Sequence, residues 1–363
     1  MPEINVDFMG QGGQMNGEVA NYLATNGAID PGQLKPYIGN NGRAYVTVFT
    51  GGSRTNPKNY KAVPIQTNAT LRRDEWKHLD EAVLKVSEQR LGGIDDLISK
   101  GLTYDLGNGG MGSTVLEYHD VSDALAAEMT MDGVARAKGD RPSYGAKYLP
   151  LPIIHADYEI NARVLAASRN MGNGIDVTLA ERAARKVNEK LEAMLFTAET
   201  YAFGGGTIYS YLNQPDRNLE SLTTNWDDSA TTAARILSDV IKMKKAAIAA
   251  KHYGPFQLYI PGNYETVLDE DYDTSGMSTQ TIRQRIEAIS GIAGVKVVDT
   301  LTDDNVLLVQ MTSDVIRLVR GMGIQNVEWQ TEGKMITKYK VMTIQVPQVR
   351  SDQDGNSGIV HLR

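Results

Sequence analysis

The chain has 363 residues, of which 41% are hydrophobic and 22% are charged, a composition that supports packed cores and suggests two to three domains. It contains no cysteine, which excludes disulfides, thiolate catalysis and cysteine-ligated zinc and is typical of a protein made in a reducing compartment. The net charge of −7 argues against nucleic-acid binding over the whole surface. With no apolar run near about 18 residues and no signal-peptide pattern, we expect a soluble protein with no membrane partner.

The first 70 residues differ in composition from the rest of the chain. Ten of the 35 glycines lie between Gly10 and Gly52, so we expect an N-terminal arm over residues 1–70 rather than an independent core. No acidic residue occurs between positions 42 and 73, and the arm's basic residues there are Arg43, Arg54, Lys58 and Lys61. This pattern predicts contact with a neighbour's acidic face or with a nucleic-acid backbone. A solvated tail is the alternative.

A helical pattern follows and then gives way to a strand pattern. The helix is predicted to start near Leu71 and to stop at Gly92-Gly93, and its apolar positions are Trp76, Leu79, Val83 and Val86. Two strands, at residues 102–106 and 113–118, are predicted to pair as a hairpin across the glycine-rich turn between them.

Residues 127–147 form a long polar excursion that is rich in turn formers and poor in core residues. Because a two-stranded hairpin is only marginally stable alone in water, the excursion is expected either to be disordered or to lie on another surface.

The helix predicted for residues 178–198 carries one apolar stripe along its whole length. Thr178 and Glu181 form the pattern of a capping box at its start. The stripe consists of Leu179, Ala183, Val187, Leu191, Met194 and Leu195. Between these positions lie charged residues that predict a solvated or subunit-facing surface, among them Arg182, Arg185, Lys186 and Glu189. An ordinary buried helix of an α/β protein is the alternative.

The C-terminal half alternates helices and strands, as in an α/β domain. The predicted elements are a helix over residues 229–251, a buried strand over 256–260, a helix with Ile282, Ile286 and Ile289 on one face, and strands over 295–298 and 306–311. The last 50 residues are mostly β, with strands predicted at 315–319, 324–329 and 335–346.

No motif predicts a catalytic, cofactor or metal site. Gly107, Gly109 and Gly112 match the dinucleotide-binding fingerprint, but a strand follows where that motif requires a helix. An α/β nucleotide-binding enzyme using the Gly107 loop is kept as the alternative of another class. Asp269, Asp271 and Asp273 have the opening spacing of a calcium loop, yet the required glycine and glutamate are replaced by Thr274 and Gln280. The five histidines are scattered, which argues against zinc.

Two blocks of sequence resemble the shell fold shared by tailed-bacteriophage major capsid proteins and encapsulins. The first runs from Leu149-Pro150-Leu151-Pro152 through Tyr158-Glu159-Ile160 to Leu195-Phe196, and the second is Tyr253-Gly254-Pro255-Phe256 with the strand that follows it. The colinear resemblance covers about residues 70–363. The glycine-rich arm and the insertion at residues 348–357 depart from encapsulins and favour a phage capsid protein.

The resemblance implies an α+β capsid shell fold with five regions. They are an arm over residues 1–70, a helix and connecting strands over 71–112, an extended loop over 113–150, a peripheral domain over 151–225 and 314–346 that holds the long spine helix 178–198, and an α/β axial domain over 226–313 and 347–363.

The resemblance also implies a function. We expect a non-enzymatic, cofactor-free major capsid protein that forms hexamers and pentamers of an icosahedral head around double-stranded DNA, bound by non-specific contact, with scaffolding, portal and decoration proteins as further partners. An encapsulin-like compartment that packages a cargo protein is the close alternative. Assembly in the host cytoplasm and location in the virion follow. Some phage shells crosslink a loop lysine to a neighbour's asparagine, and Lys138 and Lys147 are available here, although the sequence identifies no partner.

Overall fold

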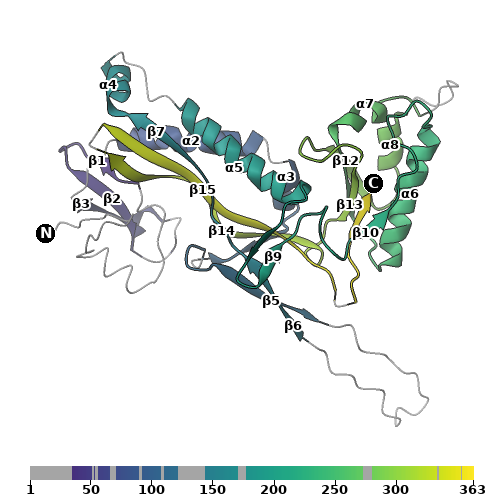
Figure 1. Cartoon of the computed structure of the whole chain (residues 1–363). Coiled ribbons are helices and arrows are strands. Elements are labelled where there is room, and N and C mark those ends of the chain that lie inside the picture. Colours follow the sequence, from purple (N-terminus) through teal and green to yellow (C-terminus); the bar gives the residue numbers. More distant parts are fainter. Residues whose placement is uncertain are drawn as a thin grey trace, which may run out of the picture.

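The computed structural model is a mixed α+β structure with two parts, each built on its own sheet (Figure 1). One part has a long four-stranded sheet covered by helices, and the other has a five-stranded sheet flanked by helices. The architecture confirms the predicted α+β class. The structure describes residues 35–50, 53, 56–65, 71–89, 92–107, 110–121, 144–170, 177–272, 280–332, 335–352 and 354–363.

The long sheet has the strand order β4-β14-β15-β7. Its centre is the antiparallel pair β14 (Ile316–Glu332) and β15 (Ile336–Val349), and β7 (Ile154–Asn161) pairs antiparallel with β15 along one edge. The short β4 (Thr103–Asp105) pairs parallel with β14 along the other edge.

β14 corrects the prediction of two short strands at residues 315–319 and 324–329. The strand is continuous, and its register against β15 shifts between Arg320 and Met322 and again between Met322 and Gln325. Gly321 and Gly323 lie at these shifts. The sequence pattern predicts that these glycines end a strand. In the structure they lie at β-bulges, which bend a strand without ending it.

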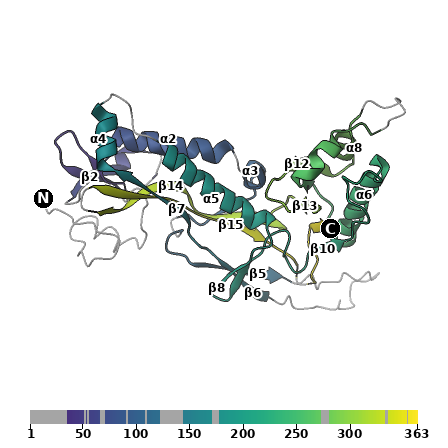
Figure 2. The ribbon, with the colours of Figure 1, turned by 45° about the horizontal axis from the view of Figure 1, so that its top comes forward.

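Helices cover one face of the long sheet (Figures 1 and 2). α2 (Arg73–Gln89) and α5 (Thr178–Phe196) lie side by side on this face, and α3 (Gly92–Ser99) lies at the end nearer the second sheet, while α4 (Ala162–Asn170) follows β7 at the opposite end. The core beneath them extends from α2 and α5 into the second sheet, where it includes Tyr259 and Val309. One hydrophobic cluster therefore bridges the two parts, and the second part has a further cluster of its own.

α5 is the predicted spine helix, but its cap and its apolar face differ from the prediction. Val177 is the N-cap, with a helical backbone and no side-chain cap bond, so Thr178 lies inside the helix and the predicted capping box is wrong. Leu179 is 42% exposed. The residues that face the core are Ala180, Ala183, Ala184, Val187, Asn188, Leu191, Leu195 and Phe196. The apolar stripe is thus rotated, because small alanines pack closest to the sheet.

α3 was not predicted. The pair Gly92-Gly93, taken as the stop of the preceding helix, instead begins this second helix. A Cβ atom at Gly93 would lie only 2.4 Å from the Phe196 ring of α5. Glycine is therefore required by a close helix–helix approach rather than by a helix end.

The second sheet has the order β10-β16-β13-β11-β12. Its strands are β10 (Asn218–Glu220), β11 (Phe256–Ile260), β12 (Ile292–Val297), β13 (Val306–Gln310) and β16 (Ile359–Leu362). Its helices are α6 (Ala233–Ala249), η4 (Gly262–Tyr264), α7 (Glu265–Leu268) and α8 (Ile282–Glu287). Every residue of β11 and β13 is buried, as expected for central strands covered on both faces. β10 lies before residue 226, so this sheet begins earlier than the predicted boundary.

Residues 37–65 form a three-stranded antiparallel sheet, β1 (Tyr37–Ile38), β2 (Ala44–Phe49) and β3 (Tyr60–Ile65), with the short η2 (Pro57–Asn59) before β3. Lys35 forms an ion pair of 2.8 Å with Asp80 of α2, and Trp76 Nε1 donates a hydrogen bond of 2.9 Å to the Pro36 carbonyl. This part of the predicted arm is therefore folded and anchored on α2, which the glycine content did not indicate.

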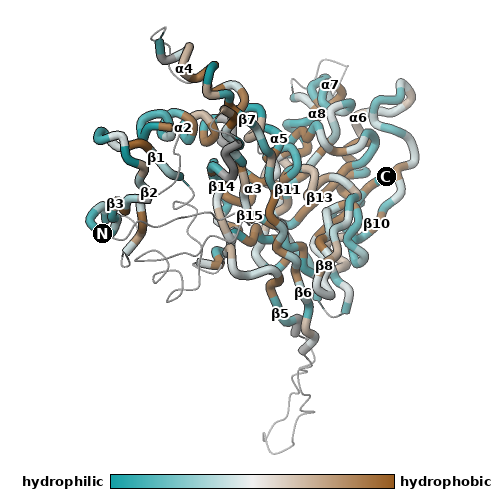
Figure 3. Tube along the Cα trace, turned by 60° about the vertical axis from the view of Figure 1, so that its left-hand side comes forward, coloured by the Kyte–Doolittle hydropathy of each residue, from teal (hydrophilic) through white to brown (hydrophobic). Residues whose placement is uncertain are grey.

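β5 (Val115–Val121) and β6 (Tyr144–Pro150) pair antiparallel and extend away from the body of the molecule (Figures 1 and 3). This is the pairing that a hairpin over residues 113–150 requires. The predicted hairpin between residues 102–106 and 113–118 is wrong, because β4 pairs with β14 instead. A small hairpin, β8 (Tyr201–Phe203) and β9 (Gly206–Ile208), lies against β6.

Candidate assembly surfaces

The predicted charged face of α5 is exposed along the outside of the long sheet's helical layer. Arg182, Arg185, Lys186 and Glu189 are all exposed, and Lys186 pairs with Glu189 at 2.7 Å. Arg182 and Arg185 form no ion pair within the part of the chain that the structure describes. Because these two guanidinium groups have no carboxylate partner there, this face can bind a carboxylate of another molecule.

The other predicted contact residues lie on two separate surfaces. Arg43, Lys58 and Lys61 are exposed on the small sheet near α2, and Lys147 lies on β6 opposite Tyr118. Arg54 and Lys138 lie outside the described residues. The structure therefore does not gather the predicted basic residues into one patch: three belong to the small sheet, one to the base of the hairpin and the rest to α5.

The glycine-rich loop after β4 does not form a nucleotide site. The Leu106 amide donates to the Arg320 carbonyl at 2.9 Å, and a Cβ atom at Gly110 would lie 1.9 Å from the Gly321 carbonyl oxygen. Here glycine permits two backbones to touch. The element that follows is the strand β5, so no helix N-terminus is available to bind a pyrophosphate. Gly109 lies outside the described residues.

Metal binding finds no support among the residues that can be described. Asp269, the first carboxylate of the calcium-like spacing, pairs with Arg283 at 3.1 Å, and Asp273 lies outside the described residues. Within the described ranges no group of three or more histidines or carboxylates could hold a metal ion. No helix among the described residues is long and apolar enough to cross a membrane.

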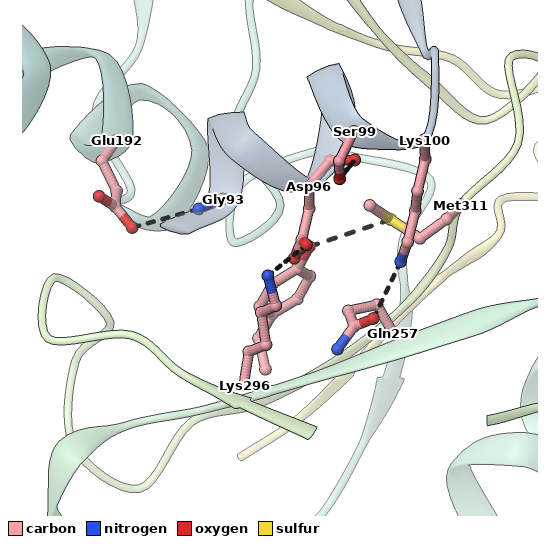
Figure 4. A network of polar contacts seen from close by, with 9 residues as sticks. Gly93, Asp96, Ser99, Lys100, Glu192, Gln257, Lys296 and Met311 are labelled. Atoms are coloured by element: carbon pink, nitrogen blue, oxygen red, sulfur yellow. Dashed lines mark hydrogen bonds and ion pairs between the residues drawn. The ribbon is translucent and has the colours of Figure 1, made fainter. Parts of the chain in front are cut away.

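A buried carboxylate joins the two parts of the molecule (Figure 4). Asp96 of α3 is 3% exposed; it accepts a hydrogen bond of 2.9 Å from the Tyr259 hydroxyl of β11 and pairs with Lys296 of β12 at 2.5 Å. Burial raises the pKa of Tyr259 well above its usual value, so the hydroxyl stays protonated and donates. We call Asp96, Tyr259 and Lys296 the joint.

Two further contacts strengthen the joint from either side. Lys100, the residue after α3, donates to the Gln257 side chain of β11 at 2.9 Å, and Glu192 of α5 accepts from the Gly93 amide at 3.4 Å (Figure 4). Burial raises the pKa of Glu192. α3 is thus tied to the spine helix at its start and to the second sheet at its end.

Sequence reasoning missed the joint. The available signal was a carboxylate between Ile94 and Leu97, both fully buried, inside a short amphipathic stretch. A charge at such a position has to find a partner, because burying it unpaired is costly. The sequence does not show that Lys296 is the partner of Asp96, because the two residues are 200 positions apart.

His361 of β16 is a buried histidine that is held neutral. Its Nε2 lies 2.7 Å from the Asn305 Oδ1, and Arg217 Nε donates to its Nδ1 at 3.4 Å, which together select the Nε2–H tautomer. Burial, and then the charges of Arg217 and Arg363, lower the pKa of His361 from 6.5 to about 4.

This lowered pKa predicts a loss of stability in mild acid. The unfolded chain binds the His361 proton more tightly than the folded chain, so stability is complete above pH 6.5 and falls as the pH drops toward 4. Between pH 7 and pH 4.5 the folded chain loses about 2 kcal/mol of stability in this way. Urea unfolding of the wild type and of His361→Gln at pH 4.5 and pH 7 should show that the wild type loses this much more than the variant. Equal losses would contradict the assignment.

Solved structures of two particle-forming proteins share the fold of this chain. The virus-like particle from Pyrococcus furiosus is 18% identical, with a TM-score of 0.56 over 80% of this chain and 99% of that one. The capsid of Myoviridae phage XM1 is 10% identical, with a TM-score of 0.57 over 75% and 91% of the two chains. These similarities show the shell fold that the resemblance predicted.

Sequence comparison identifies relatives as well. The type 1 encapsulin shell protein EncA of Myxococcus xanthus is 24% identical over 216 residues, which cover 59% of this chain and 69% of that protein. A model for a family of unknown function, DUF6260, matches residues 65–362, almost the whole of the described part. The chain therefore belongs to the family of unknown function DUF6260.

Proposed function

We propose that the chain is the structural subunit of a self-assembling icosahedral shell, with a phage head that encloses double-stranded DNA as the favoured form. The observation that carries this proposal is the shell fold itself, shared with a virus-like particle and a phage capsid over three quarters or more of the chain. In this proposal the long-sheet part is the peripheral domain, the second-sheet part is the axial domain, and hexamers and pentamers form through them.

The projecting hairpin supports assembly on physical grounds. β5 and β6 form a two-stranded sheet, and the small hairpin of β8 and β9 lies against β6. Because two strands alone are marginally stable in water, a partner surface would stabilise the hairpin. The exposed Arg182 and Arg185 of α5 offer a second contact surface, and many such weak contacts sum to a stable particle.

An encapsulin-like compartment that packages a cargo protein is the second candidate. The similarity to EncA and to the Pyrococcus furiosus particle favours it. In the phage form, scaffolding, portal and decoration proteins are further partners, the subunits assemble in the host cytoplasm, and Arg43, Lys58 and Lys61 face the DNA or a neighbouring subunit. Nucleic acid extracted from purified particles would favour the phage form, whereas a stoichiometric protein cargo would favour the compartment.

Electron microscopy of the expressed protein tests the proposal shared by both candidates. We expect closed particles of uniform diameter, alone or with phage accessory proteins. A persistent monomer under both conditions would contradict a shell function.

Shortening the hairpin should separate folding from assembly. Replacing residues 122–143 by Asn-Gly keeps the paired strands, Val121 opposite Tyr144, and joins them through a favoured two-residue turn. We expect a subunit with an unchanged thermal unfolding midpoint that forms no complete shells in sedimentation or microscopy. Normal particles from this variant would show that the hairpin is not needed for assembly. A lowered thermal unfolding midpoint would show that the hairpin stabilises the subunit instead.

A further inference from the structure

The long sheet has a free edge at β7. In the strand order β4-β14-β15-β7, β7 pairs only with β15 among the strands that the structure describes. Its eight residues alternate between the core side and solvent and contain no proline. Such an edge presents unpaired backbone donors and acceptors that can bind another extended segment.

An apolar groove lies at the C-terminal end of β7. The last residues of β7, the start of β15, α4 and the start of α5 border an open cavity of about 250 Å³ whose apolar lining consists of Ile160, Val164, Leu165, Leu179 and Ile336. Val164 is 64% exposed and Leu179 is 42% exposed. Met335, 54% exposed, borders the same place, because its carbonyl accepts a hydrogen bond of 2.7 Å from the Ala162 amide at the start of α4. Apolar side chains that gather around a groove indicate an occupant.

The charge around the groove favours an acidic occupant. Arg163 precedes the lining residue Val164 in α4, and Arg182 is one helical turn from the lining residue Leu179 in α5; both are exposed, and neither forms an ion pair within the described ranges. The carboxylate in the lining, Glu159, lies opposite Lys338 of β15 in the sheet register.

The sequence of this chain contains a segment with the matching chemistry. Residues 3–8 read Glu-Ile-Asn-Val-Asp-Phe, a strict alternation that would place Ile4, Val6 and Phe8 on one face of a strand. Residues 1–34 contain four carboxylates and no lysine, arginine or histidine. This segment lies outside the described residues.

The segment can reach the groove within the same subunit. Lys35 lies over the Trp76 ring at 5.7 Å, the rings of Trp76 and Tyr339 are 5.7 Å apart, and those of Tyr339 and Tyr158 are 5.3 Å apart. The anchored Lys35 is therefore within roughly 20 Å of β7. Residues 9–34, at about 3.3 Å each when extended, span that gap several times over.

We propose that residues 3–8 bind to the free edge of β7 in the same chain as an added strand, with Ile4, Val6 and Phe8 in the groove. The segment then covers Val164 and Leu179, and its negative charge lies near Arg163 and Arg182. The proposal does not depend on shell assembly. Its consequence is that the N-terminal segment completes the long sheet of its own subunit.

Hydrogen exchange of the full chain tests the added strand. In the wild type the β7 amides that point away from β15 should be protected, and in the variant Ile4→Asp/Val6→Asp/Phe8→Asp they should exchange roughly tenfold faster or more. The control Glu3→Gln/Asn5→Ser/Asp7→Asn changes the other face and should keep most of the protection. Equal exchange in the wild type and the apolar-face variant would overturn the proposal.

The absence of cysteine allows a second, independent measurement. Val6→Cys with Leu179→Cys should form a disulfide within one chain on mild oxidation, whereas Val6→Cys with Tyr253→Cys, the latter position 71% exposed on the second part, should not. A disulfide between two chains would overturn the same-chain assignment and place the segment on a second copy. No disulfide in either pair would overturn binding in the groove.

Discussion

Replacing Asp96 by alanine should lower the free energy of unfolding by about 3 kcal/mol. The change leaves the Tyr259 hydroxyl, which is fully buried, without its acceptor and removes the carboxylate that pairs with Lys296. We place the effect near the lower end of the range for a broken buried pair, because the Lys296 side chain is 44% exposed and can turn to water. Chemical denaturation followed by far-ultraviolet circular dichroism measures the change.

Two further variants distinguish the hydrogen bond from the charge in the joint. Asp96→Asn keeps an acceptor for Tyr259 and should recover part of the lost stability, whereas Lys296→Met leaves the buried Asp96 carboxylate without its cation and should cost about 3 kcal/mol. Since the joint ties α3 to the second sheet, Asp96→Ala should also reduce shell formation. If Asp96→Ala changed the free energy of unfolding by less than about 0.5 kcal/mol, the joint would contribute nothing to stability.

Replacing Leu191 by aspartate should prevent the chain from folding. Leu191 is fully buried in the core between α5 and the long sheet, and an unpaired charge there costs more than about 4 kcal/mol, a large fraction of the stability of a typical domain. We expect insoluble or protease-sensitive protein on expression, with no cooperative unfolding transition.

The matched control lies on the opposite side of the same helix. Arg185 is exposed, so Arg185→Asp introduces the same side chain without burying it and should change stability by about 0.5 kcal/mol or less. A soluble Leu191→Asp variant with a native-like unfolding transition would show that α5 does not form the core of the long-sheet part.

Predictions that depend on local periodicity agree best with the structure. α5 ends two residues before the predicted limit, and β11 and β13 coincide almost completely with the predicted strands at residues 256–260 and 306–311. A helix face or a buried strand is encoded by residues close together in sequence, so hydrophobic spacing is enough to find it. The exact cap of α5 was missed because Val177, an apolar residue, occupies a position where a polar side chain was expected.

Predictions that depend on pairing between distant segments agree less well. β4 was expected to pair with the strand after the glycine-rich turn, but it pairs with β14, more than 200 residues later. The sequence of a short strand shows the alternation of its apolar and polar residues but not which strand it pairs with. Backbone hydrogen bonds are the same for every partner strand. For the same reason glycine alone did not distinguish a turn at Gly110 from a close backbone approach to β14.

The amino-acid sequence by itself determined the α+β class, the long amphipathic helix, the buried central strands and, through resemblance, the shell fold. Tertiary structure alone decided the joint at Asp96, the anchoring of residues 35–38 on α2, the separation of the predicted basic residues onto different surfaces, and the free edge of β7. The physical reason is the distance along the sequence over which each kind of interaction acts. Periodicity and composition act over a few residues, whereas a buried ion pair, an unpaired edge or a surface patch exists only after distant segments have come together.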